Sequence, residues 1–225
     1  MQVYNPQEFD NVVHPINIKA IVWDFDKTLV ATHLADEQAV SKLIQQHPDA
    51  IMGKELFWQL EGFPIMTRLE RAWPGHGDEY IPYFYNKIRP QLCRGVTKVI
   101  KILKAHNYKL AVFSSRQNDA LIWGLKATQL FNYFDSVVGL DDVKQPKPHP
   151  EGLLLTLSRL GVTPEETLYI GDSNLDQEAG VEAGVLFWRA VWCAKEQYLP
   201  TARNILFRPG EVTERLEKLA TRKAS

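Results

Sequence analysis

Short apolar runs recur along this chain, separated by segments in which apolar residues have a helical spacing. Each run is rich in branched or aromatic residues and is too short for a stable helix, so each predicts a buried β-strand. The runs are residues 18–23, 110–113, 136–138, 167–170 and 185–190.

Between these runs, apolar residues recur every three or four positions, as on one face of an α-helix. Val96, Val99 and Leu103 form such a face after Gly95. Further helices are predicted from about residue 118, between Pro150 and Gly161, before Gly184, and over residues 211–221. Because strands alternate with helices, we expect an α/β fold with a doubly wound parallel sheet.

The segment 33–93 has a different pattern, with helical spacing and no alternation typical of strands. Asp36 is expected to cap its first helix. We therefore predict an α/β core formed by residues 1–32 and 94–225, with an all-helical cap formed by residues 33–93.

Aromatic residues are frequent in this cap: Phe57, Trp58, Phe63, Trp73, Tyr80, Tyr83, Phe84 and Tyr85. We favour the interpretation that they fill a small core over the alternative that they stack on a substrate. Arg68 and Arg71 either reach a substrate anion or face solvent, and the sequence does not choose between these.

Polar side chains follow three of the predicted strands. Asp24 and Asp26 come directly after the first strand, Ser114 follows the second, and Asp172 follows the strand at 167–170. The carboxyl ends of parallel strands meet at one edge of the sheet, where open α/β sheets bind ligands. Lys147 stands in a Pro-flanked loop that could reach the same edge. Together these residues predict a metal site, a phosphate-binding site and a nucleophile.

In these motifs the chain resembles the hydrolases of the haloacid dehalogenase superfamily, in the branch of phosphoglycolate phosphatases and β-phosphoglucomutases. The motifs are a D-x-D-x-T/V strand end, a strand ending in Ser or Thr, a K-P lysine and a G-D-x-x-x-D loop. They correspond here to 24–28, Ser114, Lys147 and 171–176. Lys27 departs from the pattern, since many members have glycine at that position.

The resemblance implies a Rossmann-like core and a Mg²⁺-dependent phosphatase that forms an aspartyl-phosphate. Asp24 would be the nucleophile, and Asp26 would act as general acid and then as general base. Asp24, the backbone carbonyl of Asp26 and Asp172 would hold Mg²⁺.

Ser114 and Ser115 would bind the phosphoryl oxygens, and Lys147 would balance the negative charge of nucleophile and phosphate. The alternative for Ser114 is an ordinary helix-capping serine. Asp176 either steers a metal ligand or stabilises the first turn of the next helix, and both interpretations stay open.

Two other functions remain possible on this fold. A sugar-phosphate mutase would use the same core, but such mutases carry an arginine three residues after a cap glycine. Counting from Gly62 gives Ile65, which favours hydrolysis. A non-catalytic binding protein would have lost the nucleophile or a metal acid, whereas Asp24 and Asp172 are both present.

The composition limits the classes of molecule that we expect the protein to bind. The 225 residues are 45% hydrophobic and 24% charged, and 26 basic against 27 acidic residues give a net charge of −1. This balance gives no bulk attraction to nucleic acid or membrane surfaces. The family resemblance implies a small phosphorylated metabolite as partner. No apolar run approaches the roughly 20 residues of a membrane span, and no signal peptide is evident. Cys93 and Cys193 predict no disulfide framework, in keeping with a reducing, cytoplasmic location. The oligomeric state is left open.

Overall fold

A six-stranded, all-parallel sheet forms the centre of the molecule in the computed structural model, which describes residues 17–60, 63–84, 90–193 and 204–221. The strand order is β3-β2-β1-β4-β5-β6, so β1 lies in the interior of the sheet. The strands are β1 (Ala20–Trp23), β2 (Lys109–Phe113), β3 (Ser136–Val138), β4 (Thr167–Gly171), β5 (Leu186–Ala190) and β6 (Ile205–Leu206). The five predicted strands are confirmed, with ends shifted by no more than two residues, and β6 was not predicted.

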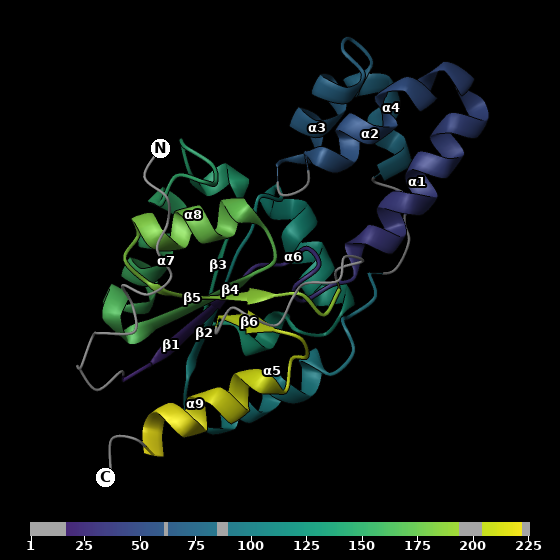
Figure 1. Cartoon of the computed structure of the whole chain (residues 1–225). Helices are drawn as coiled ribbons and strands as arrows, with labels where there is room; N and C mark the ends of the chain where they lie inside the picture. Colours follow the sequence, from purple (N-terminus) through teal and green to yellow (C-terminus); the bar gives the residue numbers. More distant parts are fainter. Residues whose placement is uncertain (1–16, 61–62, 85–89, 194–203, 222–225) are drawn as a thin grey trace.

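Helices cover both faces of the sheet (Figure 1). One face packs against α5 (Val96–Ala105), α6 (Asn118–Ala127) and α9 (Glu211–Thr221), and the other against α7 (Glu151–Leu160) and α8 (Asn174–Glu182). Strand β1 serves both layers, because Ile21 and Trp23 join the first core while Ala20 and Val22 join the second. A fully buried aliphatic or aromatic side chain contributes roughly 1.5–3 kcal/mol, so two-sided burial fixes this strand firmly. The doubly wound α/β fold is confirmed.

Four further helices form a separate group beyond one end of the sheet (Figure 1). They are α1 (Thr32–Gln46), α2 (Lys54–Gln59), α3 (Ile65–Ala72) and α4 (Gly77–Phe84), with a 3₁₀ turn η2 (Pro48–Gly53) between the first two. Three short 3₁₀ turns lie in the rest of the chain: η3 (Phe131–Tyr133), η4 (Leu140–Asp142) and η5 (Pro164–Glu166). No helix within the described ranges is long and apolar enough to cross a membrane.

The helical group has a hydrophobic core of its own. Leu43, Phe57, Leu69, Trp73 and Tyr80 are buried together there. Most of the described cap aromatics thus pack on one another, as the favoured interpretation expected. No strand lies among the described residues between 33 and 84, in agreement with an all-helical insert. The predictions that fall on residues 1–16, Gly62 and Tyr85 lie outside the described residues.

The expected capping role of Asp36 is wrong. Helix α1 already begins at Thr32, so Asp36 stands inside it. Its carboxylate instead accepts a hydrogen bond of 2.9 Å from the Arg68 guanidinium of α3. The Asp36 carboxylate, which the sequence analysis expected at the start of a helix, therefore links α1 to α3.

The cysteines also differ from expectation, since Cys93 and Cys193 form a disulfide across a sequence separation of 100 residues. Both cysteines lie close to residues 28–29, which follow β1 along the chain. The Cys93 backbone N–H donates to the Leu29 carbonyl at 2.9 Å, and the indole N–H of Trp192 donates to the Thr28 carbonyl at 2.9 Å. The fold thus brings together two thiols that no sequence spacing connects.

Candidate active site

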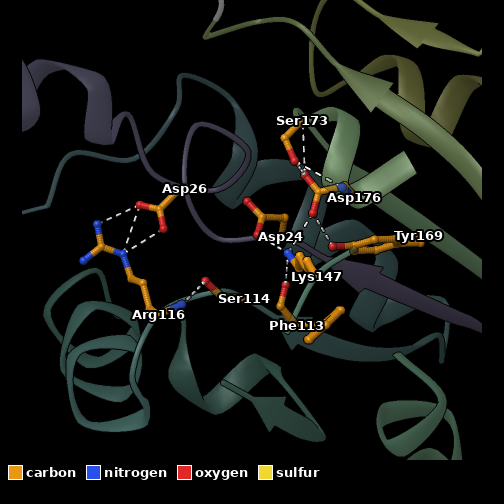
Figure 2. A network of polar contacts seen from close by, with 9 residues as sticks. All are labelled: Asp24, Asp26, Phe113, Ser114, Arg116, Lys147, Tyr169, Ser173 and Asp176. Atoms are coloured by element: carbon orange, nitrogen blue, oxygen red, sulfur yellow. Dashed lines mark hydrogen bonds and ion pairs between the residues drawn. The ribbon is translucent and has the colours of Figure 1, made fainter. Parts of the chain in front are cut away.

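The side chains singled out by the sequence meet at the carboxyl edge of the sheet (Figure 2). In the parallel register Trp23 lies beside Val112 of β2 on one side and Ile170 of β4 on the other. The next residue of β1, Asp24, donates its backbone N–H to the Ile170 carbonyl at 2.8 Å. Sheet register alone therefore sets Asp24 between the ends of two neighbouring strands.

Lys147 is the centre of the polar network (Figure 2). Its Nζ lies 2.7 Å from Asp24 Oδ1, 2.7 Å from Asp176 Oδ1 and 3.0 Å from the Phe113 carbonyl. The residue is 4% exposed, and its peptide bond to Pro148 is cis. Burial alone would lower the pKa of Lys147, but the Asp176 and Asp24 carboxylates raise that pKa well above its usual value. The two carboxylates thus favour the charged form of the ammonium, which they share.

Asp176 lies in the first helical turn, as one of the two open interpretations expected, and it also joins the polar network; a role in steering a metal ligand stays a prediction. It lies in the first turn of α8, where its Oδ2 accepts from the Ser173 N–H and hydroxyl at 3.0 and 2.6 Å. Its Oδ1 accepts from Lys147 and from the Tyr169 hydroxyl at 2.6 Å. A side chain on Gly171 would place its Cβ 2.5 Å from the Asp176 carboxyl carbon, so glycine at this strand end makes room for the acid.

Three carboxylates form a possible metal site. Asp24, Asp172 and Asp176 each offer one oxygen, and these oxygens lie within 4.8 Å of one another. Burial and the neighbouring acids raise the pKa of Asp24 well above its usual value despite Lys147. Burial likewise raises the pKa of Asp172 to about 6, against the effect of Lys27. A site of hard oxygen ligands with excess negative charge suits Mg²⁺.

Asp26 has a different partner. Arg116, two residues beyond Ser114, holds it through three short contacts: Nε lies 3.0 and 2.8 Å from the two carboxylate oxygens, and Nη2 lies 2.7 Å from Oδ1. Burial alone would raise the pKa of Asp26, but the guanidinium holds that pKa below its usual value. The sequence analysis gave Arg116 no role, although its place near a strand end was a usable signal.

Ser114 and Ser115 occupy different positions. Ser114 is buried, and its Oγ accepts a hydrogen bond of 3.2 Å from the Arg116 backbone N–H. Helix α6 has Gln117 as its N-cap, so the helix-capping alternative for Ser114 is wrong. Ser115 lines the cavity above the strand ends.

Arg189, at the end of β5, is a second residue that sequence reasoning missed. Its guanidinium donates to the Asp172 carbonyl at 2.9 Å, to Asn174 Oδ1 at 2.8 Å and to Gln177 Oε1 at 2.7 Å. It thereby ties the loop that carries Asp172 to the start of α8. No motif pointed to it, because its partners become neighbours only when β5 pairs with β4.

A cavity of about 330 Å³ opens over these residues and reaches the cap. Asp24, Asp26 and Lys147 line its core side. Phe63 and Arg68 are among the cap residues that line it. The Arg68 guanidinium is buried, pairs with Asp36, and lies 3.9 Å from the centre of the Phe57 ring. It therefore belongs to the cavity wall and not to the solvated surface, and its contact with a substrate anion stays a prediction.

Comparison with known proteins places this geometry in a family. The haloacid dehalogenase-like hydrolase family matches residues 21–190, a range that contains the site residues that follow β1, β2 and β4. The chain belongs to this family. The predicted resemblance, and with it the prediction of a hydrolytic enzyme, is confirmed.

Curated relatives cover most of the chain. Pyrophosphatase PpaX of Listeria welshimeri is 33% identical over 185 residues, covering 79% of this chain and 85% of the relative. Pyrophosphatase PpaX of Bacillus velezensis is 30% identical over 192 residues, with coverages of 79% and 85%.

Solved structures share the fold. β-Phosphoglucomutase from Clostridium difficile has a TM-score of 0.69 at 19% identity and covers 92% of this chain and 100% of its own. CbbY from Rhodobacter sphaeroides, solved in complex with phosphate, has a TM-score of 0.69 at 20% identity, with coverages of 87% and 96%. At these identities the likeness establishes the architecture alone.

Proposed function

We propose that this protein is a Mg²⁺-dependent phosphatase that hydrolyses small phosphorylated molecules through an aspartyl-phosphate on Asp24. One observation carries the proposal. Asp24 stands at the carboxyl end of the interior strand β1, faces the cavity, contacts the buried Lys147 at 2.7 Å and has an Asp172 oxygen within 4.8 Å. A carboxylate placed between a fixed cation and a metal-binding oxygen set is suited to attack a phosphoryl group.

The reaction has two steps. A carboxylate oxygen of Asp24 bonds to phosphorus while the bond from phosphorus to the leaving oxygen breaks, and Asp26 gives that oxygen a proton. Asp26 then takes a proton from a water molecule whose oxygen attacks phosphorus, releasing phosphate and free Asp24. Lys147 keeps Asp24 oriented and offsets negative charge throughout.

Asp24, Asp172 and the backbone carbonyl of Asp26 would hold Mg²⁺, and Asp176 would position Asp172 and Lys147 around it. The bound ion supplies positive charge opposite the phosphoryl oxygens. The Ser115 hydroxyl on the cavity wall is the better placed of the two serines to donate to those oxygens, with buried Ser114 shaping the loop beneath it.

The helical segment 33–93 acts in this proposal as a lid that sets specificity. Its support is the cavity itself, which has the catalytic acids on one side and Phe63, Met66 and Arg68 on the other. A lid contacts the leaving group of the substrate, while the core contacts the phosphate.

Pyrophosphate is the first substrate to test, because the curated relatives are named pyrophosphatases and the cavity is small. A sugar-phosphate mutase remains the second candidate, since β-phosphoglucomutase shares the fold. Mutase activity would return an isomer of the substrate and little free phosphate.

The test is phosphate release from pyrophosphate, phosphoglycolate, glucose 1-phosphate and p-nitrophenyl phosphate, each with Mg²⁺ and with EDTA. Mg²⁺-dependent release that is lost in Asp24→Asn supports the proposal. Conversion of glucose 1-phosphate to an isomer would favour the mutase. Retention of binding without any turnover would favour a non-catalytic protein.

A further inference from the structure

Lys27 occupies a backbone position that disfavours a side chain. Its φ is +55°, in the left-handed region that glycine adopts more readily than other residues. Its N–H donates to the Val30 carbonyl at 2.6 Å, which closes the tight turn after the two acids of β1. The backbone alone would therefore prefer glycine here, so the lysine side chain needs a reason of its own.

That reason lies in the ion pair of Lys27 with Asp172. The Lys27 Nζ lies 3.1 Å from Asp172 Oδ2, and the two side chains are only 18% and 16% exposed. Both residues line the cavity. The pair therefore joins the loop after β1 to the loop after β4, directly across the site.

Every carboxylate of the site has a cationic partner. Lys147 lies 2.7 Å from both Asp24 and Asp176, and Arg116 lies 2.7 Å from Asp26. Lys27 gives Asp172 the same kind of partner. Three cations thus offset most of the charge of the four acids without any bound ion.

We infer that Lys27 is a built-in counter-ion that competes with Mg²⁺ for Asp172, stabilising the metal-free site and weakening metal affinity. This rests on the proposed metal site. An ammonium and a divalent ion on one carboxylate repel each other strongly in a partly buried setting. The Lys27 Nζ must therefore withdraw from Asp172 when the metal enters, and the lost ion pair opposes binding.

The experiment measures the Mg²⁺ dissociation constant of the metal-depleted full chain by titration calorimetry. Lys27→Asn removes the charge and tolerates a left-handed backbone. It should bind Mg²⁺ about tenfold more tightly than the unaltered protein, as expected when one nearby positive charge is lost. Lys27→Arg keeps the charge, and Lys144→Asn removes an exposed lysine outside the site. Both control variants should have a Mg²⁺ dissociation constant within about twofold of that of the unaltered protein.

Thermal unfolding gives a readout that does not depend on activity. The increase in Tm on adding a fixed Mg²⁺ concentration should be larger for Lys27→Asn, because tighter binding stabilises the folded state more. If Lys27→Asn fails to fold, Lys27→Gly, for which φ +55° is unstrained, takes its place.

Mg²⁺ affinity that is unchanged or weaker in the neutral variants would overturn the inference and show that Lys27 organises Asp172 for the metal. If neither the unaltered protein nor the variants bind Mg²⁺, the proposed metal site falls, and the inference falls with it. The two failures are thus distinguishable.

Discussion

Asp24 and Asp26 stand two residues apart, yet the fold gives them opposite electrostatic surroundings. Asp24 is buried among other acids, which raises its pKa, while Asp26 is about a third exposed (33%) and its pKa is held down by Arg116. The difference arises because β1 ends at Trp23 and the chain then turns, with the Val30 N–H donating to the Phe25 carbonyl, whereas in a continued strand two positions two residues apart would share a face. One acid faces the metal-binding group, and the other faces the loop after β2 (Figure 2).

Replacing Asp24 by Asn should reduce turnover to below a few per cent, because an amide does not attack phosphorus. Phosphate release in a steady-state assay measures this. The exposed Asp49→Asn in the cap is the matched control and should retain full activity. Substantial activity in Asp24→Asn would mean that another residue is the nucleophile.

Replacing Arg116 by Gln should shift the basic limb of the pH profile of kcat/KM to higher pH, because Asp26 must carry a proton in the first step. The guanidinium now opposes the effect of burial on the Asp26 carboxyl, so its removal lets burial raise that pKa. The profile should be recorded with p-nitrophenyl phosphate. Arg71→Gln, an exposed cap variant, should leave the limb in place. An unmoved limb in Arg116→Gln would show that Asp26 does not control it.

Replacing Asp176 by Asn should destabilise the fold by roughly 3–5 kcal/mol at pH 7, since it removes a buried partner of Lys147. Burial alone would raise the pKa of Asp176, but Lys147 lowers it overall. This carboxylate therefore stabilises the fold above its unfolded pKa of about 3.9, and the gain is lost as pH falls through the lower folded pKa.

Urea denaturation at several pH values measures this effect. The difference in free energy of unfolding between the unaltered protein and Asp176→Asn should become smaller below about pH 4. Glu182→Gln, at the exposed end of the same helix, is the control and should change stability little. A pH-independent difference would indicate that packing, and not charge, stabilises this position.

Sequence reasoning found the residues that stand directly at strand ends, because position in a strand fixes where a side chain emerges. Asp24 and Lys147 lie where the motifs placed them (Figure 2). Asp172 also lies there, with a carboxylate oxygen within 4.8 Å of one of Asp24. Arg116 and Arg189 were missed because their roles depend on the direction of a long side chain and on strands that pair only in the fold. Such partners leave no pattern along the chain.

At the scale of elements, apolar runs located the strands well because burial on both faces demands continuous hydrophobicity. Strand β6 escaped because it has only two residues and pairs at the edge with β5. Asp36 misled because an acid before an apolar face resembles a cap, whereas its partner Arg68 comes from another helix. The limits of the cap at 33 and 93 stay a prediction.

The cap should determine which substrates are preferred. Phe63→Ala enlarges the cap side of the cavity, so ratios of kcat/KM between substrates should change by about tenfold or more. The rate of p-nitrophenyl phosphate hydrolysis by this variant should stay within several-fold of that of the unaltered protein. Met52→Ala, at an 87% exposed cap residue, should change neither quantity. If Phe63→Ala lowered kcat/KM for every substrate by the same factor, this result would argue against a role of the cap in specificity.

At the scale of the whole molecule, the order of the strands assembles the site from distant parts of the chain. The interior strand β1 carries Asp24, the proposed nucleophile, and its neighbours β2 and β4 bring the loop of Ser114 and the proposed metal ligand Asp172. The alternation of strands and helices was enough to predict the parallel, doubly wound sheet, but not the order of its strands. The pairing of Cys93 with Cys193 was not predictable, because it depends on two loops returning to the same side of β1.

The Cys93–Cys193 bond closes a covalent ring that contains Ser114, Lys147 and Asp172, whereas Asp24 lies on the arm outside it. A single protease nick inside the ring should leave one species on a non-reducing gel and two after reduction. A nick in α1–α4 should instead release the arm that bears the nucleophile under both conditions. Separation of fragments from an in-ring nick without reductant would show that the ring is open. Asp24 on the arm is therefore joined to the site residues in the ring by one continuous stretch of chain. That stretch contains the cap helices α1–α4.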